Sequence, residues 1–152
     1  MKPHPAAAIA LVAISPDAAT TRRLGRDLAH RLAPGDVVLL DGDLGSGKTE
    51  LVRGLAEGLG ADASEVASPT FALVHEYGPE GAPPLLAHAD FFRLESAEAR
   101  LTIGELGLSE LRSRGAVLVI EWPLPPWTGE GSVRVRIDVL PGGARRVRVA
   151  AV

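Results

Sequence analysis

The residues best suited to chemistry lie in one glycine-rich segment, residues 42–49, with the sequence GDLGSGKT. Its spacing fits the P-loop pattern G-x-x-x-x-G-K-[ST]. Glycines let successive backbone N–H groups turn toward one point, and a helix that begins near Lys48 aims the positive end of its dipole at the same point. We therefore expect a polyphosphate site, in which Lys48 reaches the β and γ phosphates and the Thr49 hydroxyl coordinates Mg²⁺.

Lys48 is unusual for this chain. The only other lysine among the 16 basic residues is Lys2, so nearly every cationic position is an arginine. Lysine brings a compact charge on a thin stem, whereas arginine is planar and bulky. A site that requires a compact charge on a thin side chain would explain why position 48 is a lysine and not an arginine.

Turnover of a nucleotide also needs a carboxylate for Mg²⁺ and a group that orients the attacking water. Asp90 and Glu121 each follow an apolar run that is typical of a buried strand. The carboxyl ends of parallel strands meet at one edge of a sheet, where such side chains can face the phosphates. Asp90 and Glu121 are therefore the two candidates for this carboxylate, and Glu121 has the cleaner geometry. Thr70, behind Pro69, is a further candidate for the metal shell, through its hydroxyl or its backbone. The alternative is that each carboxylate is simply the first solvated residue after its strand.

Apolar patterning predicts the strands that position these residues. Continuous apolar runs, typical of strands buried on both faces, cover residues 37–40, 85–89 and 117–120. The run 6–14 is also interpreted as a strand, because nine residues cannot span a bilayer. Gly and Pro residues in the connection 78–84 favour an antiparallel hairpin between residues 70–77 and 85–90. Alternating residues predict a second hairpin from residues 133–139 and 147–149.

Leucines at every fourth position predict two helices. The first is expected over residues 16–32, with Ser15 as its cap and Pro16 in its first position. The second follows the glycine-rich segment and ends at Gly60 in a left-handed conformation. Further helical pieces are expected over residues 97–114, interrupted near Gly104 and Gly107. The predicted fold is therefore an α/β, P-loop NTPase-like three-layer domain with a mixed, mostly parallel sheet, flanking helices and a C-terminal antiparallel hairpin.

Composition excludes several other classes. The chain has 152 residues, a net charge of −3 and 46% hydrophobic residues, which predicts a single soluble domain over residues 1–152. The absence of cysteine excludes disulfides and thiolate zinc sites, and the four histidines are scattered. A mildly acidic chain with 4% aromatic residues is a poor candidate for binding nucleic acid by charge and stacking alone. Any role with nucleic acid is expected to be indirect.

Two further observations concern ligands. No lysine follows Lys48, so the Asn-Lys-x-Asp element by which Ras-type GTPases read guanine is absent, and ATP is the expected nucleotide. Arginines also alternate along the predicted C-terminal hairpin, at positions 134, 136, 146 and 148. This is either a basic ribbon for tRNA or an acidic partner, or an ordinary solvated face opposite a valine-rich core face. The ordinary face is the favoured interpretation.

Four segments together resemble the TsaE (YjeE) family of bacterial P-loop ATPases in their order and spacing. They are GDLGSGKT at 42–49, SPTF at 68–71, HADFFRL at 88–94 and IEWP at 120–123. The resemblance runs from about residue 20 to residue 123 and implies a role in making threonylcarbamoyladenosine beside the anticodon of tRNAs that read codons starting with A. It also implies a cytoplasmic ATPase, away from membranes, that works with TsaD, the transferase, and TsaB, and that meets tRNA through that complex.

Carried over position by position, the resemblance places Lys48 on phosphate, Thr49 on Mg²⁺ and Thr70 in a switch-like loop. Asp90 and Glu121 would serve the metal and the water. The residues expected to contact ATP or ADP are Asp43, Leu44, Gly45, Ser46, Gly47, Lys48, Thr49, Glu50 and Trp122. The chain departs from the family pattern at Glu50, usually a second Thr or Ser, at Leu124, usually Glu, and at Phe92, commonly Tyr.

Two other functions remain open from the sequence. A small-molecule P-loop kinase would use the same loop, with an arginine-rich lid from residues 93–114. A nucleotide-sensing module would bind the nucleotide without turning it over.

Overall fold

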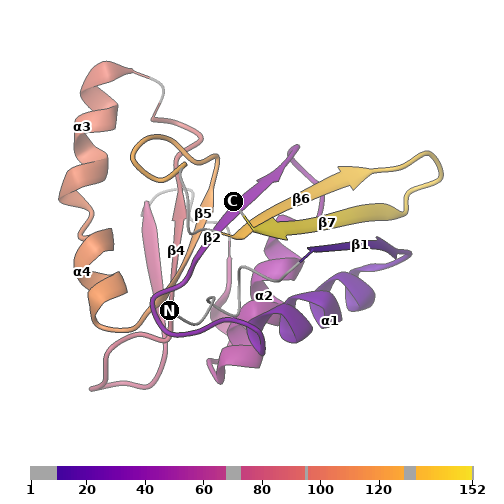
Figure 1. Ribbon diagram of the computed structural model, residues 1–152, viewed down its shortest axis with the longest axis horizontal. Helices are drawn as coiled ribbons and strands as arrows, with labels where there is room; N and C mark the ends of the chain where they lie inside the picture. The colour runs from indigo at the N-terminus through magenta and orange to yellow at the C-terminus, as the bar shows by residue number, and fades with distance from the viewer. Residues whose placement is uncertain (1–9, 68–72, 95, 129–132, 152) are drawn as a thin grey trace.

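A single seven-stranded sheet forms the centre of the molecule (Figure 1). The computed structural model describes residues 10–67, 73–94, 96–128 and 133–151. The sheet has the strand order β1-β7-β6-β2-β5-β4-β3. Its strands are β1 (Ala10–Ser15), β2 (Val37–Gly42), β3 (Val74–Tyr77), β4 (Leu86–Asp90), β5 (Val117–Glu121), β6 (Val133–Val139) and β7 (Arg145–Ala151).

The sheet is mixed, as predicted, and its parallel pairing is confined to the four central strands. β6, β2, β5 and β4 pair in parallel, whereas β3, β7 and β1 join by antiparallel pairing. β1 runs in the same direction as β6, because both are antiparallel to β7. Five strands, β1, β6, β2, β5 and β4, therefore end at one edge of the sheet, and the segments that follow them lie along that edge.

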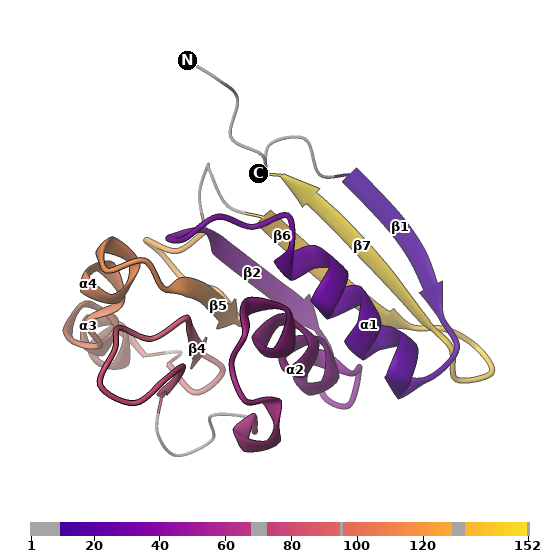
Figure 2. The ribbon, with the colours of Figure 1, turned by 90° about the horizontal axis from the view of Figure 1, so that it is seen from below.

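Helices pack on both faces of the sheet, and the two pairs of helices cover partly different strands (Figure 2). α1 (Ala18–Ala29) and α2 (Lys48–Leu59) pack on one face and share a core with alternate residues of β2, β5, β6 and β7. α3 (Ala97–Glu105) and α4 (Leu108–Ser113) pack on the other face, with the opposite residues of β2, β4 and β5. A short 3₁₀ helix, η2 (Ala63–Glu65), follows α2. The central strands are thus buried on both faces, as their continuous apolar runs predicted.

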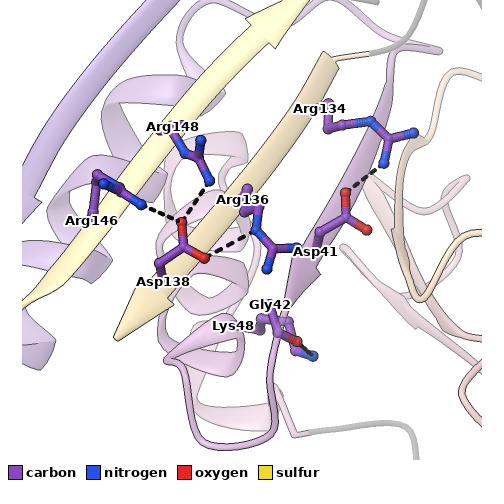
Figure 3. A network of polar contacts seen from close by, with 8 residues as sticks. All are labelled: Asp41, Gly42, Lys48, Arg134, Arg136, Asp138, Arg146 and Arg148. Carbon is purple, nitrogen blue, oxygen red and sulfur yellow. Dashed lines mark hydrogen bonds and ion pairs between the residues drawn. The ribbon is translucent and has the colours of Figure 1, made fainter. Parts of the chain in front are cut away.

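The face of β6 and β7 that α1 and α2 leave uncovered carries the alternating arginines (Figure 3). Arg136, Arg146 and Arg148 all contact the carboxylate of Asp138, and Arg134 pairs with Asp41 on β2. Their valine and isoleucine neighbours along the strands point into the core on the other side. The favoured interpretation of the arginines as a solvated sheet face is consistent with this arrangement.

Local details correct the sequence-based expectations at two places. Asp17, not Ser15, caps α1: its backbone is extended and its carboxylate accepts a hydrogen bond from Thr20 N at 2.8 Å. Ser15 is instead the buried last residue of β1, with its hydroxyl 2.7 Å from that of Thr21. Gly104 does not interrupt a helix, since α3 continues through it to Glu105, and the break between α3 and α4 lies at Leu106 and Gly107.

The other elements agree with the predictions within a few residues. Gly60 ends α2 in a left-handed conformation with φ 91°. Both predicted hairpins are antiparallel pairs, β3 with β4 and β6 with β7. The N-terminal part of the predicted strand 6–14, and Thr70 with its neighbours, lie outside the described residues.

Candidate functional site

The glycine-rich segment forms a tight loop between the end of β2 and the start of α2. Gly47 has φ 107°, a conformation that favours glycine, and it stands immediately before the first residue of α2. A Cβ at Gly42 would lie 2.9 Å from the backbone carbonyl oxygen of Ile137, so glycine lets the start of the loop pack closely against β6. The loop thus places the free N–H groups at the start of α2 beside the carboxyl edge of the sheet.

Lys48 folds back over this loop. Its side chain is largely buried, and its Nζ donates a hydrogen bond to Gly42 O at 2.5 Å (Figure 3). Nζ also lies 4.5 Å from the centroid of the Trp122 ring. Trp122 has φ 53°, which turns the chain sharply out of β5 directly after Glu121. The ammonium is therefore held between a carbonyl and an aromatic face, at the loop where a phosphate would bind.

Asp90 and Glu121 lie side by side because β4 and β5 pair in parallel with these two residues in register. Asp90 accepts a hydrogen bond from Phe92 N at 2.8 Å, whereas Glu121 is almost completely buried. His88 is fully buried behind Glu121, with Nε2 at 3.6 Å from Oε1. Within the described residues neither ring nitrogen of His88 has a hydrogen-bond partner.

The two carboxylates differ in acidity. Burial would raise the pKa of Glu121, but the neighbouring His88 and Lys48 outweigh it and hold this pKa below its ordinary value. Burial, together with the adjacent Glu121 carboxylate, raises the pKa of Asp90. A pKa held below its ordinary value keeps the Glu121 carboxylate ionised at neutral pH. An ionised carboxylate is an acceptor that can hold a water molecule or a hard cation.

A cavity of about 380 Å³ joins these groups to the loop. It is lined by Leu44, Gly45, Gly47, Lys48, Thr49, Glu50, Asp90, Glu121 and Trp122. The groups around it fit a magnesium-bound polyphosphate: backbone N–H groups and an ammonium for the phosphates, and a hydroxyl and two carboxylates for the metal. The described residues contain no group of three or more acidic or histidine side chains that could hold a metal by themselves. Phosphate oxygens and water would complete the coordination.

Most of the predicted site residues therefore meet in one place. Asp43 and Ser46 are the exceptions among the residues expected to contact nucleotide, because neither lines this cavity. Asp43 is exposed, and Ser46 is buried with an Oγ that has no hydrogen-bond partner among the described residues. The predicted metal ligand Thr70 lies outside the described residues.

Arg145 is a contact of the loop that the sequence did not suggest. It is the first residue of β7, and its guanidinium donates hydrogen bonds to Ser46 O at 2.9 Å and Gly45 O at 3.3 Å. It also binds Gly143 O in the β6–β7 turn. β6 is parallel to β2, so the turn that follows β6 arrives at the same edge as the loop. Nothing local in the sequence signals this contact between residues about a hundred positions apart, whereas a histidine inside the apolar run 85–89 could have drawn attention to His88.

This arrangement defines a P-loop NTPase-like α/β protein. A buried parallel strand leads into a glycine-rich loop and a helix that bears Lys48 and Thr49, and the neighbouring strand ends in a carboxylate. No helix in the described part of the chain has both the length and the apolar character needed to cross a membrane.

Comparison with known proteins identifies the family. The profile of the family described as "Threonylcarbamoyl adenosine biosynthesis protein TsaE" matches residues 15–144. A TsaE protein of Streptomyces coelicolor is 42% identical over 125 residues, which cover 77% of this chain and 78% of the relative. A TsaE protein of Treponema pallidum is 37% identical over 143 residues, or 90% of this chain and 98% of that one. The chain belongs to the TsaE family.

A solved structure supports the fold as well. The crystal structure of Bacillus subtilis YdiB matches 95% of this chain and 87% of its own, with a TM-score of 0.71 and 27% sequence identity. The resemblance inferred from four short segments is thus confirmed over nearly the whole chain.

Proposed function

We propose that this protein is a Mg²⁺-dependent ATPase that supports the formation of threonylcarbamoyladenosine in tRNAs that read codons starting with A. It would act in the cytoplasm with TsaD and TsaB, and tRNA would meet the complex rather than this chain alone. Membership of the TsaE family supports the pathway. The observation that carries the chemistry is the cavity that places Lys48 and Thr49 opposite Asp90 and Glu121.

In the proposed reaction a water attacks the γ phosphorus of ATP, the bond to the β–γ bridging oxygen breaks, and ADP and phosphate leave. Lys48 and the N–H groups of the loop stabilise the negative charge on the transferred phosphoryl group. Glu121 orients the attacking water through its ionised carboxylate. Mg²⁺, when held by Thr49 and the carboxylates, would neutralise charge on the β and γ oxygens.

The test is an ATPase assay of the purified protein with and without TsaD and TsaB. We expect slow turnover alone and faster turnover with the partners, because the partners are expected to complete the site. Lys48→Ala should abolish both turnover and nucleotide binding. Glu121→Gln should abolish turnover and keep binding. A rate that does not respond to the partners would contradict the role in the complex, and a wild-type protein that binds but never hydrolyses ATP would be a nucleotide-sensing module.

The packing of α3 and α4 disfavours the small-molecule kinase. Ile103, Leu108 and Leu111 are buried in the core on the face of the sheet that carries Leu118 and Ile120. This segment is therefore part of the packed domain rather than an arginine-rich lid over the loop. A screen of nucleosides and sugars for phosphorylation is expected to find no acceptor.

A further inference from the structure

A histidine lies in the middle of the buried strand β4, next to the candidate site. His88 is fully buried, and neither of its ring nitrogens has a hydrogen-bond partner within the described residues. A buried polar atom without a partner costs free energy that an apolar residue of similar size would avoid. The strand is otherwise apolar up to Asp90, so the imidazole at this position calls for an explanation in its surroundings.

The pairing of β4 with β5 brings Glu121 to this ring (Figure 1). Asp90 and Glu121 are in register, and His88 precedes Asp90 by two residues, so all three side chains point to the same face of the sheet. His88 Nε2 lies 3.6 Å from Glu121 Oε1. Glu121 lines the cavity of about 380 Å³, whereas His88 is not among the described residues that line it. The imidazole therefore acts on the carboxylate from inside the protein.

Glu121 needs such a contact for the role proposed above. A carboxylate that orients water must keep its oxygens at fixed positions. The carboxylate of Asp90 stands beside it in register and repels it when both are ionised. A donor behind Glu121 would hold one oxygen in place and leave the other free to accept a hydrogen bond from water.

The present distance fits a contact that forms fully only in the complex. An N–H···O hydrogen bond spans about 2.7–3.2 Å, so the two atoms are slightly too far apart for one. Hydrogen bonds at active sites are often long before the substrate binds and shorten once it is bound. A shift of about 0.5 Å would bring Nε2 and Oε1 within range.

We propose that His88 positions the Glu121 carboxylate for the attacking water, by donating a hydrogen bond from Nε2 to Oε1 when nucleotide is bound. The inference rests on the proposed function and adds which residue holds the water-orienting group. His88 touches neither the water nor the phosphates, so it is a positioning residue. Its Nε2 proton stays on the ring throughout the reaction.

The test compares two substitutions of nearly equal length. A glutamine can present an N–H donor near the place of Nε2, whereas a methionine fills similar space without a donor. The ATPase assay with TsaD and TsaB gives kcat and KM, and thermal melting gives the stability. His75→Met is the matched control, because His75 is in register with His88 on β3 but places its Nδ1 3.2 Å from the hydroxyl of Tyr77.

We expect His88→Met to lower kcat at least tenfold and to leave the KM for ATP within twofold of the wild-type value. Its melting temperature should equal or exceed that of the wild type, because the substitution removes an unpartnered polar group from the core. His88→Gln should keep kcat within threefold, and His75→Met within twofold.

A merely structural histidine would behave differently. If His88→Met keeps the wild-type kcat, or if His88→Gln loses as much activity as His88→Met, the positioning role is wrong. A His88→Met variant that melts well below the wild type would assign the ring to packing and overturn the proposal as well. Either result would leave the ATPase function itself intact.

A second measurement concerns the wild-type protein. Nitrogen-15 NMR of the imidazole rings shows which nitrogen carries the proton, and the signals missing from His88→Gln identify those of His88. With Mg-ADP bound we expect a proton on Nε2, and Glu121→Gln should shift its resonance. A ring protonated only on Nδ1 would turn a lone pair toward the carboxylate and refute the hydrogen bond. Wild-type protein that binds ATP without hydrolysing it would refute the ATPase and the positioning role together.

Discussion

Individual side chains at the candidate site are held by contacts that a bound phosphate would replace. Lys48 Nζ is shared between Gly42 O and the Trp122 ring. Both contacts are weaker for an ammonium than a direct contact with a phosphate oxygen, because a phosphate carries a full negative charge whereas a carbonyl oxygen and an aromatic face carry only partial charges. Binding of a nucleotide is therefore expected to draw Lys48 away from the indole.

This shift gives an optical prediction. Addition of Mg-ADP should change the tryptophan fluorescence, because the emission of Trp122 responds to the cation over its ring. Trp122→Phe should remove the change. Trp127 packs against the core near α3 and α4, so Trp127→Phe is the control that should keep it. A full signal in Trp122→Phe would show that Lys48 and Trp122 do not separate on binding.

Among the elements, the β6–β7 hairpin has two roles. One end of β7 places Arg145 on the loop, and the strand beyond it presents Arg146 and Arg148 on the open face of the sheet. The hydrogen bonds from Arg145 occupy the carbonyl oxygens of Gly45 and Ser46 and so fix the backbone of the loop that would bind a phosphate. The hairpin thus supports the loop from the side of β2 opposite to Asp90 and Glu121.

Arg145→Gln should therefore weaken nucleotide binding by roughly tenfold, about 1.4 kcal/mol. The comparison is Arg146→Gln, which loses an ion pair on the exposed face and should leave the Kd within twofold. Calorimetry with Mg-ADP measures both. If the two variants bind equally well, Arg145 does not position the loop.

Helices α1 and α2 approach each other closely at glycines. A Cβ at Gly54 would overlap the backbone carbonyl of Arg22, and one at Gly25 would overlap that of Leu51. Backbone on both sides cannot yield as a flexible side chain would. The close contact fixes the direction of α2 and, with it, the position of the loop at its first residue.

Gly54→Ala is accordingly expected to destabilise the fold by at least about 2 kcal/mol, as overpacking in a core does. Gly104→Ala is the matched control, because it also lies within a helix but a Cβ there meets no atom of another residue within 4 Å. It should stabilise the protein by about 0.5–1 kcal/mol through helix propensity. Urea unfolding of both variants measures the difference. If the free energy of unfolding of Gly54→Ala equals that of the wild type, α1 and α2 can move apart without loss of stability, and the close contact is not required.

At the scale of the whole molecule, arginine–carboxylate contacts join α1 to α2 and join the two strands of the β6–β7 hairpin. Glu57 on α2 binds Arg22 and Arg26 on α1, and Asp138 binds three arginines of the hairpin. Burial acts against ionisation of both acids, but their arginine partners outweigh it, so the pKa of each lies below its ordinary value. Asp90, which is half-buried and whose pKa is raised, acts in the opposite sense.

These directions predict the response to acid. A carboxylate with a lowered folded pKa contributes stability that is complete above its unfolded pKa, about 4, and is lost as the pH falls through the folded value. The melting temperature should hence fall below about pH 4.5. Glu57→Gln should reduce that fall and lower the melting temperature at pH 7. If the melting temperature of Glu57→Gln falls in acid as much as that of the wild type, other carboxylates cause the loss of stability.

The sequence by itself determined the strands, the helices and the position of the glycine-rich loop between them, because these depend on local spacing. Alternation and leucine repeats report which side of a strand or helix is apolar, and G-x-x-x-x-G-K-T specifies a loop whose backbone can bind phosphate. The same local signals placed Lys48, Thr49, Asp90 and Glu121 at the ends of elements. The cap of α1 was misplaced by two residues because Ser15 and Asp17 are both good caps, and only the backbone conformation distinguishes them.

Only the tertiary structure decided which residues share the loop's edge. Strand order and direction bring Arg145 to the loop from about a hundred residues further along the chain, and they bury His88 against Glu121. Such contacts depend on how the sheet is assembled, which no periodicity along the chain encodes. The P-loop could therefore be recognised from its own eight residues, whereas the Arg145 contact that holds it and the His88 ring behind Glu121 could not.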